Sequence, residues 1–277
     1  MLPEGIGELI ERALAEDVGD GDHTSLSTIP ADARGAAHLL VKASGVLAGM
    51  EMASAVCARV DADLNLRPML KDGARVSPGD VAFTLNGPSR SILLAERVLL
   101  NFMQRMSGIA TLTRSFVDVL EGTKCQVLDT RKTTPGLRTV EKWAVRIGGG
   151  MNHRQGLFDM MMIKDNHADF AGGIPRAIQA ALAYQRERGM SLPIEVETRN
   201  MAEVAQVMAI GGIQRIMLDN FDTAQLREAV KLIDGHFETE ASGGITLTTA
   251  RAFAECGVDY ISVGALTHSA TTLDMSL

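Results

Sequence analysis

The second half of the chain alternates short apolar runs with longer amphipathic stretches, and this alternation limits the possible folds more than any other feature. The six clear runs with β character are followed, in most cases, by a helical pattern. These runs occupy residues 126–129, 160–164, 193–197, 215–219, 237–241 and 260–263, and the helical patterns occupy 177–188, 201–210, 224–233 and 248–256. Strands that alternate with helices form parallel sheets, so we predict an α/β fold with an open, incomplete barrel of about seven strands, eight being the alternative.

The first half of the chain mixes helices with short strands and predicts a separate domain. Residues 3–17 have the apolar spacing of an amphipathic helix, and the polar, glycine-rich segment 18–28 predicts a loop. Residues 38–85 show short strands between turns, and the rhythm of 71–85 favours a structural β hammerhead over a cofactor carrier, because no acceptor lysine turn is present. A long helical stretch from about 89 to 120 should link an N-terminal domain, 1–112, to the barrel, 113–277.

Composition narrows the class of protein. At 277 residues, 46% of them hydrophobic and 22% charged, the chain can bury one large core or two modest ones. Three distant cysteines favour a reducing compartment over a disulfide framework or a zinc site. No apolar run is long enough to span a membrane, the N-terminus lacks the pattern of a signal peptide, and a net charge of -7 disfavours nucleic acid as a partner. We therefore expect a soluble, cytoplasmic protein.

Positive charge is concentrated in one segment of this acidic chain. Residues 131–164 contain seven Lys and Arg against two acids, a local excess of +5. This excess predicts a pocket for a small polyanion. Lys132 and Lys164 each follow a β run, at the strand ends where α/β barrels place their chemistry.

Carboxylates follow or end the neighbouring runs. In the IEVE segment Glu195 and Glu197 share one face of the strand, and Asp219 ends the next run. Carboxylates that point into a barrel require partners, and Lys132, Lys164 or a bound Mg²⁺ are the candidates. A purely structural ion-pair layer is the alternative for the glutamates, and a helix N-cap is the alternative for Asp219.

Glycine-bearing loops end the last two runs, at 241–246 and 262–269. Backbone N–H groups near Gly243 and Gly264 could converge on one phosphate, and tight strand-to-helix turns are the less favoured explanation of the glycines. His153 and Arg154, which follow the triple glycine 148–150, could bind a carboxylate or form an ordinary surface pair. The sequence around Arg97 predicts only a surface arginine whose aliphatic part packs on apolar neighbours.

Taken together, the motifs closely resemble the quinolinate phosphoribosyltransferases, also called nicotinate-nucleotide pyrophosphorylases (carboxylating). The resemblance implies an N-terminal α/β sandwich domain, a C-terminal open barrel and a homodimer whose active sites are completed by the neighbouring subunit. It also implies transfer of phosphoribosyl from phosphoribosyl pyrophosphate to quinolinate, with loss of CO₂, Mg²⁺ as cofactor and nicotinate mononucleotide as product. The matching segments are AEDVGDGDHTS, AERVLLNFMQRMSGIAT, DTRKTTPGLR, GGGMNHRQGL, IKDNH, IEVE, MLDNF, EASGGIT and GVDYISVGALTHSA.

The resemblance also implies roles for individual residues. The quinolinate carboxylates would be held by Arg131, His153, Arg154 and Lys164, and Lys132 would lie between the two substrates. Glu197 and Asp219 would bind the ribose hydroxyls and Mg²⁺, and together with Lys132 and Lys164 they form the expected catalytic group. The 5′-phosphate would be held by Ser242, Gly243 and Gly264, with His268 nearby. Arg97 would reach across the dimer interface.

Other functions remain open from the sequence. A related phosphoribosyltransferase that acts on another base, such as the homologue associated with molybdate transport, is the nearest alternative. Nicotinate as the base, a Schiff-base aldolase using Lys164 and a non-catalytic sensor of phosphorylated metabolites are weaker ones. The intact TRKTTPGLR and NHRQGL segments favour quinolinate, because both of its carboxylates then have cationic partners.

Overall fold

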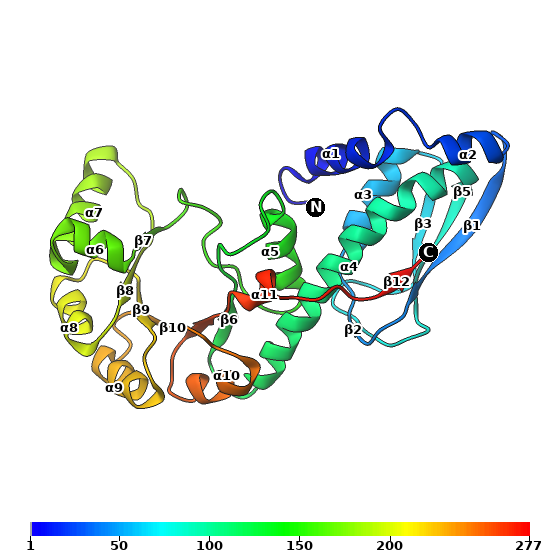
Figure 1. Cartoon of the computed structure of the whole chain (residues 1–277). Helices are drawn as coiled ribbons and strands as arrows, with labels where there is room; N and C mark the ends of the chain where they lie inside the picture. Colours follow the sequence, from blue (N-terminus) through cyan, green and yellow to red (C-terminus); the bar gives the residue numbers. More distant parts are fainter. Residues whose placement is uncertain (1) are drawn as a thin grey trace. The chain divides into compact units, whose positions relative to one another are not determined.

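A computed structural model describes residues 2–277 of the chain and contains two compact units (Figure 1). The first comprises the described residues up to Arg114 together with Thr133–Gly149 and Leu266–Leu277, and the second comprises Ser115–Lys132 and Gly150–Ala265. The linear division into domains 1–112 and 113–277 remains a prediction. The two later segments that belong to the first unit were not expected from the sequence.

The first unit contains an antiparallel sheet and the helices that accompany it. The sheet has the strand order β12-β1-β5-β3, and a separate pair joins β2 to β4. The strands are β1 (Arg34–Val41), β2 (Gly45–Val46), β3 (Asn65–Pro68), β4 (Arg75–Val76), β5 (Val81–Pro88) and β12 (Met275–Ser276). The helices wholly within the unit are α1 (Ile6–Val18), α2 (His23–Thr28), α3 (Met50–Val60) and α5 (Arg138–Ile147).

The long predicted helix is present as α4 (Ser89–Val119), which begins in the first unit and ends in the second. Its buried residues include Leu99, Met103, Met106 and Ile109, whose spacing places them on one side of the helix. The prediction of a loop over 18–28 was wrong for its second half. There the side chain of Asp22 accepts a hydrogen bond from the Ser25 N–H at 3.0 Å and caps α2.

The second unit is built on an all-parallel sheet of six strands in the order β6-β11-β10-β9-β8-β7 (Figure 1). The strands are β6 (Gln126–Leu128), β7 (Met161–Ile163), β8 (Ile194–Thr198), β9 (Arg215–Asp219), β10 (Glu238–Ser242) and β11 (Tyr260–Ser262). The connecting helices are α6 (Asp165–Ala171), α7 (Ile174–Arg188), α8 (Met201–Ile210), α9 (Thr223–Ile233) and α10 (Leu247–Ala254), and α11 (Ala265–His268) follows β11. The prediction of an open α/β barrel is confirmed.

The expected number of about seven strands was too high by one. Among residues 2–277 the end strands β6 and β7 are not paired with each other, so the barrel is open at this point. Only an isolated parallel bridge between Leu128 and Met151 extends the sheet beyond β6. The chain there carries the triple glycine and the NHR segment, and glycine-rich chain is a poor strand former.

The register of the sheet decides which side chains meet. Arg215 of β9 is paired with Glu195 of β8 on one side and with Glu238 of β10 on the other. Because all six strands are parallel, their carboxyl ends lie at one edge, and the polar residues that follow them are gathered there.

Within the described part of the chain, no helix combines the length and the apolar character that crossing a bilayer requires.

Candidate functional site

The carboxyl ends of the parallel strands bring together most of the residues selected from the sequence. Each of the six strands contributes at least one of them, within its last two residues or in the loop that follows. In sheet order these are Arg131 and Lys132 after β6, Gly264 after β11, Ser242 and Gly243 at the end of β10, Asp219 at the end of β9, Glu197 in β8, and Lys164 after β7.

Lys164 and Glu197 form the central ion pair of this edge. The Nζ atom of Lys164 lies 3.2 Å from Oε2 of Glu197, and the N–H of Asp165 donates to Oε1 of the same carboxylate at 3.4 Å. The lysine side chain is 47% exposed and that of Glu197 only 9%, so the amine can exchange its partner for a ligand while the carboxylate stays fixed. Lys164 is thus poised at the edge rather than buried in a structural layer.

Asp219 lies beside this pair and does not cap the next helix. Asp222 performs that task, since its carboxylate accepts the N–H groups of Ala224 and Gln225 at 2.9 and 2.8 Å. Burial, and then the charge of Glu197, raise the pKa of Asp219. Its neighbour Asn220 has a φ of +57° and donates from Nδ2 to the Asp219 carboxylate at 2.6 Å.

Glu197 and Asp219 are the candidate ligands of a divalent cation at this edge. Glu197 and Asp219 repel one another strongly enough to affect the pKa of Asp219, and Lys164 offsets only part of that repulsion. Two carboxylates at one strand edge are the hard oxygen donors that Mg²⁺ prefers, with substrate and water oxygens completing its coordination. The donor set therefore fits the expected magnesium ion.

Backbone geometry shapes the glycine loop after β10. Gly243 and Gly244 both have positive φ, at +102° and +59°, and the Asn220 N–H donates to the Ser242 carbonyl. A Cβ at 243 would lie 2.2 Å from Oδ1 of Asn220, so this loop packs directly against the loop that carries Asp219. β10 and β11 are adjacent, which places Ser242 and Gly264 on neighbouring strand ends.

Arg154 is an arginine that the fold partly buries beside another cation. The residue is only 8% exposed, and its guanidinium donates to the Met160 carbonyl at 3.2 Å. Burial, and then the positive charge of Arg131, lower the pKa of Arg154. Two guanidinium groups held near one another in the protein form a binding site for an anion with more than one negative charge.

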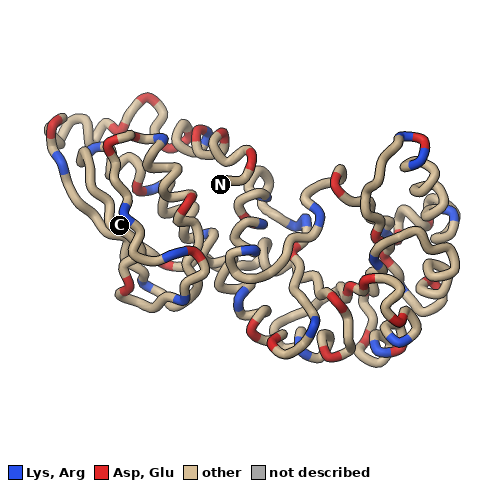
Figure 2. Tube along the Cα trace, turned by 180° about the vertical axis from the view of Figure 1, so that it is seen from behind, with Lys and Arg blue, Asp and Glu red and all other residues tan. Residues whose placement is uncertain are grey.

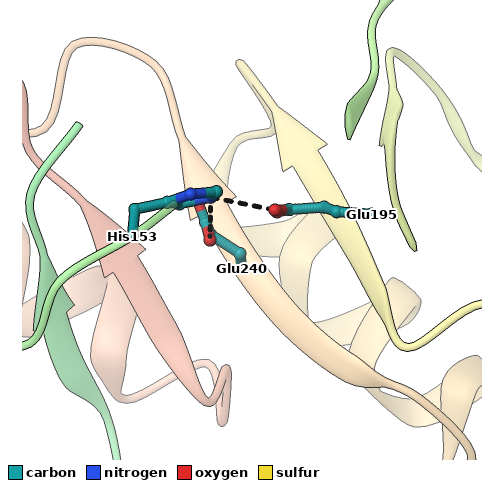
Figure 3. Close-up of side chains that lie close together, drawn as sticks. All are labelled: His153, Glu195 and Glu240. Carbon is teal, nitrogen blue, oxygen red and sulfur yellow. Dashed lines mark ion pairs between the residues drawn. The ribbon is translucent and has the colours of Figure 1, made fainter. Parts of the chain in front are cut away.

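His153 lies deeper, in a buried polar cluster with Glu195 of β8 and Glu240 of β10 (Figure 3). Its Nε2 atom is 2.9 Å from Oε2 of Glu195 and 3.4 Å from Oε2 of Glu240, and the side chains are 4%, 0% and 0% exposed. Arg215 supplies positive charge, with Nη1 at 3.1 Å from Glu240. The buried-layer alternative thus describes Glu195, whereas Glu197 lies at the edge.

The protonation of this cluster is shared between its members. Burial, and then the charge of Glu240, raise the pKa of Glu195 to about 7. Burial acts to lower the pKa of His153, but Glu195 and Glu240 outweigh it and raise that pKa to about 9. Two buried carboxylates and one guanidinium leave an excess negative charge. Because Nδ1 of His153 accepts the Arg154 N–H, the added proton that offsets this charge resides on Glu195.

Three residues of interest belong to the first compact unit. Arg97 is exposed on α4, His268 is exposed with Nδ1 at 2.7 Å from the Ser269 hydroxyl, and Lys142 is almost completely buried in α5. The cation-rich segment 131–164 is therefore divided between the two units. Figure 2 shows acidic and basic residues along both units, as expected for a chain whose charge excess is local.

Sequence reasoning missed several residues that support the edge. Asp129 is fully buried and accepts the His153 N–H at 2.8 Å, and Asn220 separates Asp219 from the glycine loop. Glu240 and Arg215 also escaped notice. The available signal was period-2 alternation, because Glu238, Glu240 and Ser242 share one face of their strand as Glu195 and Glu197 share one of theirs.

Comparison with known proteins agrees with this arrangement. Residues 22–107 match the model for the quinolinate phosphoribosyl transferase N-terminal domain, and residues 109–277 match the model for the C-terminal domain. The chain belongs to the quinolinate phosphoribosyltransferase family.

Individual relatives are similar over nearly the whole chain. A quinolinate phosphoribosyltransferase [decarboxylating] 1b of Nicotiana tabacum is 48% identical over 97% of this chain and 81% of its own length. A probable nicotinate-nucleotide pyrophosphorylase [carboxylating] of Bacillus subtilis is 42% identical over 98% and 92%. The crystal structure of NadC from Streptococcus pyogenes is 40% identical and superposes with a TM-score of 0.94 over 100% of this chain and 96% of that one.

Proposed function

We propose that this chain transfers the phosphoribosyl group of phosphoribosyl pyrophosphate to quinolinate and releases pyrophosphate and CO₂, giving nicotinate mononucleotide for NAD biosynthesis. The main structural support is the pairing of two partly screened carboxylates, Glu197 and Asp219, with a group of cations on one barrel edge. The names of the relatives support the same reaction.

The reaction divides the edge into two binding regions. Arg131, Arg154 and Lys164 would hold the two quinolinate carboxylates, with His153 as the neighbour of Arg154, and Lys132 would lie between the substrates. Ser242, Gly243 and Gly264 would receive the 5′-phosphate through hydroxyl and N–H groups, with His268 nearby. Glu197 and Asp219 would hold Mg²⁺ and the ribose hydroxyls, and a bound Mg²⁺ would neutralise charge on the departing pyrophosphate.

The chemistry needs no protein nucleophile. The ring nitrogen of quinolinate forms a bond to the anomeric carbon as the bond from that carbon to the pyrophosphate oxygen breaks. The resulting pyridinium accepts the electron pair when the bond from C2 to the carboxylate breaks, so that CO₂ leaves and C2 takes up a proton. The residues of this chain would hold the two substrates in line and place carboxylates near the developing positive charge on the ribose.

We further propose a homodimer in which Arg97 reaches the neighbouring subunit's site, and a cytoplasmic location. An exposed arginine on a long, largely buried helix suits the first, and three buried free cysteines suit the second. Mixing an Arg97→Ala subunit with an Arg154→Ala subunit should restore part of the activity, because one of the two sites in a mixed dimer is then intact. Absence of recovery in verified mixed dimers would contradict shared sites.

The direct test supplies phosphoribosyl pyrophosphate, Mg²⁺ and quinolinate labelled in its 2-carboxylate, with nicotinate in a parallel reaction. Labelled CO₂ together with nicotinate mononucleotide, and no product from nicotinate, is the expected result. Pyrophosphate release with a different base and no labelled CO₂ would instead identify a related phosphoribosyltransferase.

A pair of variants links that activity to the site. Arg154→Ala removes a charged donor and should lower kcat/KM for quinolinate by about 100-fold, since two hydrogen bonds to a charged group contribute roughly 3 kcal/mol. Arg188→Ala is the control, because Arg188 is exposed on α7 and stacks on Tyr184 at 4.8 Å. Equal activity of the two variants would contradict the assignment of Arg154.

A further inference from the structure

Both ring nitrogens of His153 face other groups of the protein in the buried cluster below the site. The imidazole Nδ1 accepts the backbone N–H of Arg154 at 2.7 Å, and the backbone N–H of His153 donates to Asp129 at 2.8 Å. Nε2 faces Glu195 and Glu240, as Figure 3 shows. With both ring nitrogens in protein contacts and its side chain 4% exposed, the imidazole offers a substrate no ready donor.

These contacts fix the tautomer of the imidazole. A backbone N–H can only donate, so Nδ1 must carry a lone pair toward Arg154. A neutral imidazole always carries one proton, which therefore lies on Nε2. Two lone pairs facing one another at 2.9 Å would repel, so the position of Glu195 favours the same assignment.

Arg154 is the residue that needs this support. Its guanidinium is held beside Arg131, whose charge repels it, and it donates to the Met160 carbonyl at 3.2 Å. The backbone of Arg154 is fixed as well, because its N–H donates a hydrogen bond to Nδ1 of His153. A change of tautomer would set a proton on Nδ1 against that N–H and push the backbone of Arg154 away.

We propose that Glu240 and Glu195 are positioning residues that hold the Nε2 proton of His153, so that Nδ1 fixes Arg154 in place for a dicarboxylate substrate. The inference rests on the proposed function for the identity of that substrate. It assigns His153 an indirect part in binding, through the backbone of Arg154. Arg215, 3.1 Å from Glu240, limits the cost of burying the two carboxylates.

The test compares two glutamates of one strand. Glu240→Gln keeps the size of the side chain but removes the charge that selects the Nε2 proton, whereas Glu238→Gln changes a residue that pairs with the same Arg215 at 2.9 Å and does not reach His153. We expect Glu240→Gln to raise the KM for quinolinate by about tenfold with the KM for phosphoribosyl pyrophosphate nearly unchanged. Glu238→Gln should leave both unchanged. Glu195→Gln takes the place of Glu240→Gln if the latter does not fold.

Variants of His153 separate positioning from direct binding. Asparagine can place an oxygen acceptor where Nδ1 lies, so His153→Asn should retain most quinolinate affinity, whereas His153→Leu should lose it. Equal loss in both His153 variants, together with an unchanged KM in Glu240→Gln, would overturn the proposal in favour of direct binding. A lower melting temperature with neither KM changed would reduce the cluster to a structural role.

Calorimetric titration with quinolinate alone provides a readout that does not depend on turnover. Weaker binding by Glu240→Gln than by Glu238→Gln supports the inference even if the wild-type protein releases no CO₂. The absence of CO₂ release by the wild-type protein would refute the proposed function and leave the inference standing.

Discussion

Gly243→Ala is expected to damage both stability and catalysis, because the loop after β10 has no space for a side chain. An added Cβ would lie 2.2 Å from Oδ1, 2.8 Å from Cγ and 3.0 Å from the backbone nitrogen of Asn220. The φ of +102° is also unfavourable for alanine. Backbone strain of about 1–3 kcal/mol and overpacking of about 1–3 kcal/mol together predict a loss of roughly 2–6 kcal/mol in the free energy of unfolding.

The neighbouring glycine provides the control. Gly244 has a φ of +59° and no atom within 4 Å of an added Cβ, so Gly244→Ala should cost only about 1–2 kcal/mol. The displaced Asn220 is bonded to Asp219, so Gly243→Ala should also lower kcat/KM for phosphoribosyl pyrophosphate by at least about tenfold, or 1.4 kcal/mol. Urea unfolding and steady-state kinetics measure both effects. Equal unfolding midpoints and equal kcat/KM for the two variants would refute the steric argument.

Three further predictions concern packing, pH and thiols. Gly108→Ala should lower the melting temperature although alanine normally stabilises a helix, because its Cβ would lie 1.9 Å from the Thr271 carbonyl; a raised melting temperature would contradict this. Burial acts to raise the pKa of Asp259, but hydrogen bonds from Lys124 and Thr239 outweigh it and lower that pKa in the folded protein. The ionised Asp259 therefore stabilises the fold above the unfolded-state pKa of about 3.9, and this stabilisation is lost as the pH falls through the folded-state pKa. The stability difference between wild type and Asp259→Asn should thus shrink below about pH 4, and a difference independent of pH would count against it. Burial raises the pKa of Cys57 to about 11 and that of Cys125 to about 12, so both thiols should react with maleimide at pH 8 far more slowly in the native than in the denatured protein; equal rates would exclude buried thiols.

The long-range pattern of the barrel could be predicted because each of its elements has a strong local signal. All six strands of the parallel sheet lie within or next to the runs read from the sequence, and α4 begins at the residue expected. The missing elements are short or depend on distant partners. β12 has two residues and exists only because it pairs with β1, and α2 depends on a cap by Asp22 in a segment rich in turn formers.

The sequence could supply a set of candidate site residues but not their geometry. The carboxyl-edge rule brought Lys164, Glu197 and Asp219 together, and the resemblance supplied their expected roles. Neither could show that Asp222, and not Asp219, caps the N-terminus of α9. Which of the two aspartates becomes the cap depends on the backbone conformation between them, including the positive φ of Asn220. Nor could they show that both ring nitrogens of His153 are engaged within the protein.

The two glutamates of IEVE show how depth along a strand separates residues that the sequence treats alike. They share one face, and a spacing of two residues displaces them by about 6.6 Å along the strand. That step takes Glu197 to the edge, where Lys164 can be exchanged for a ligand, and leaves Glu195 fully buried against His153. A carboxylate at the edge can respond to substrate charge, whereas one in the interior can only hold other groups still. The same substitution at the two positions should therefore have different effects. Glu197→Gln should weaken the use of the sugar-phosphate substrate, and Glu195→Gln should weaken the binding of the dicarboxylate.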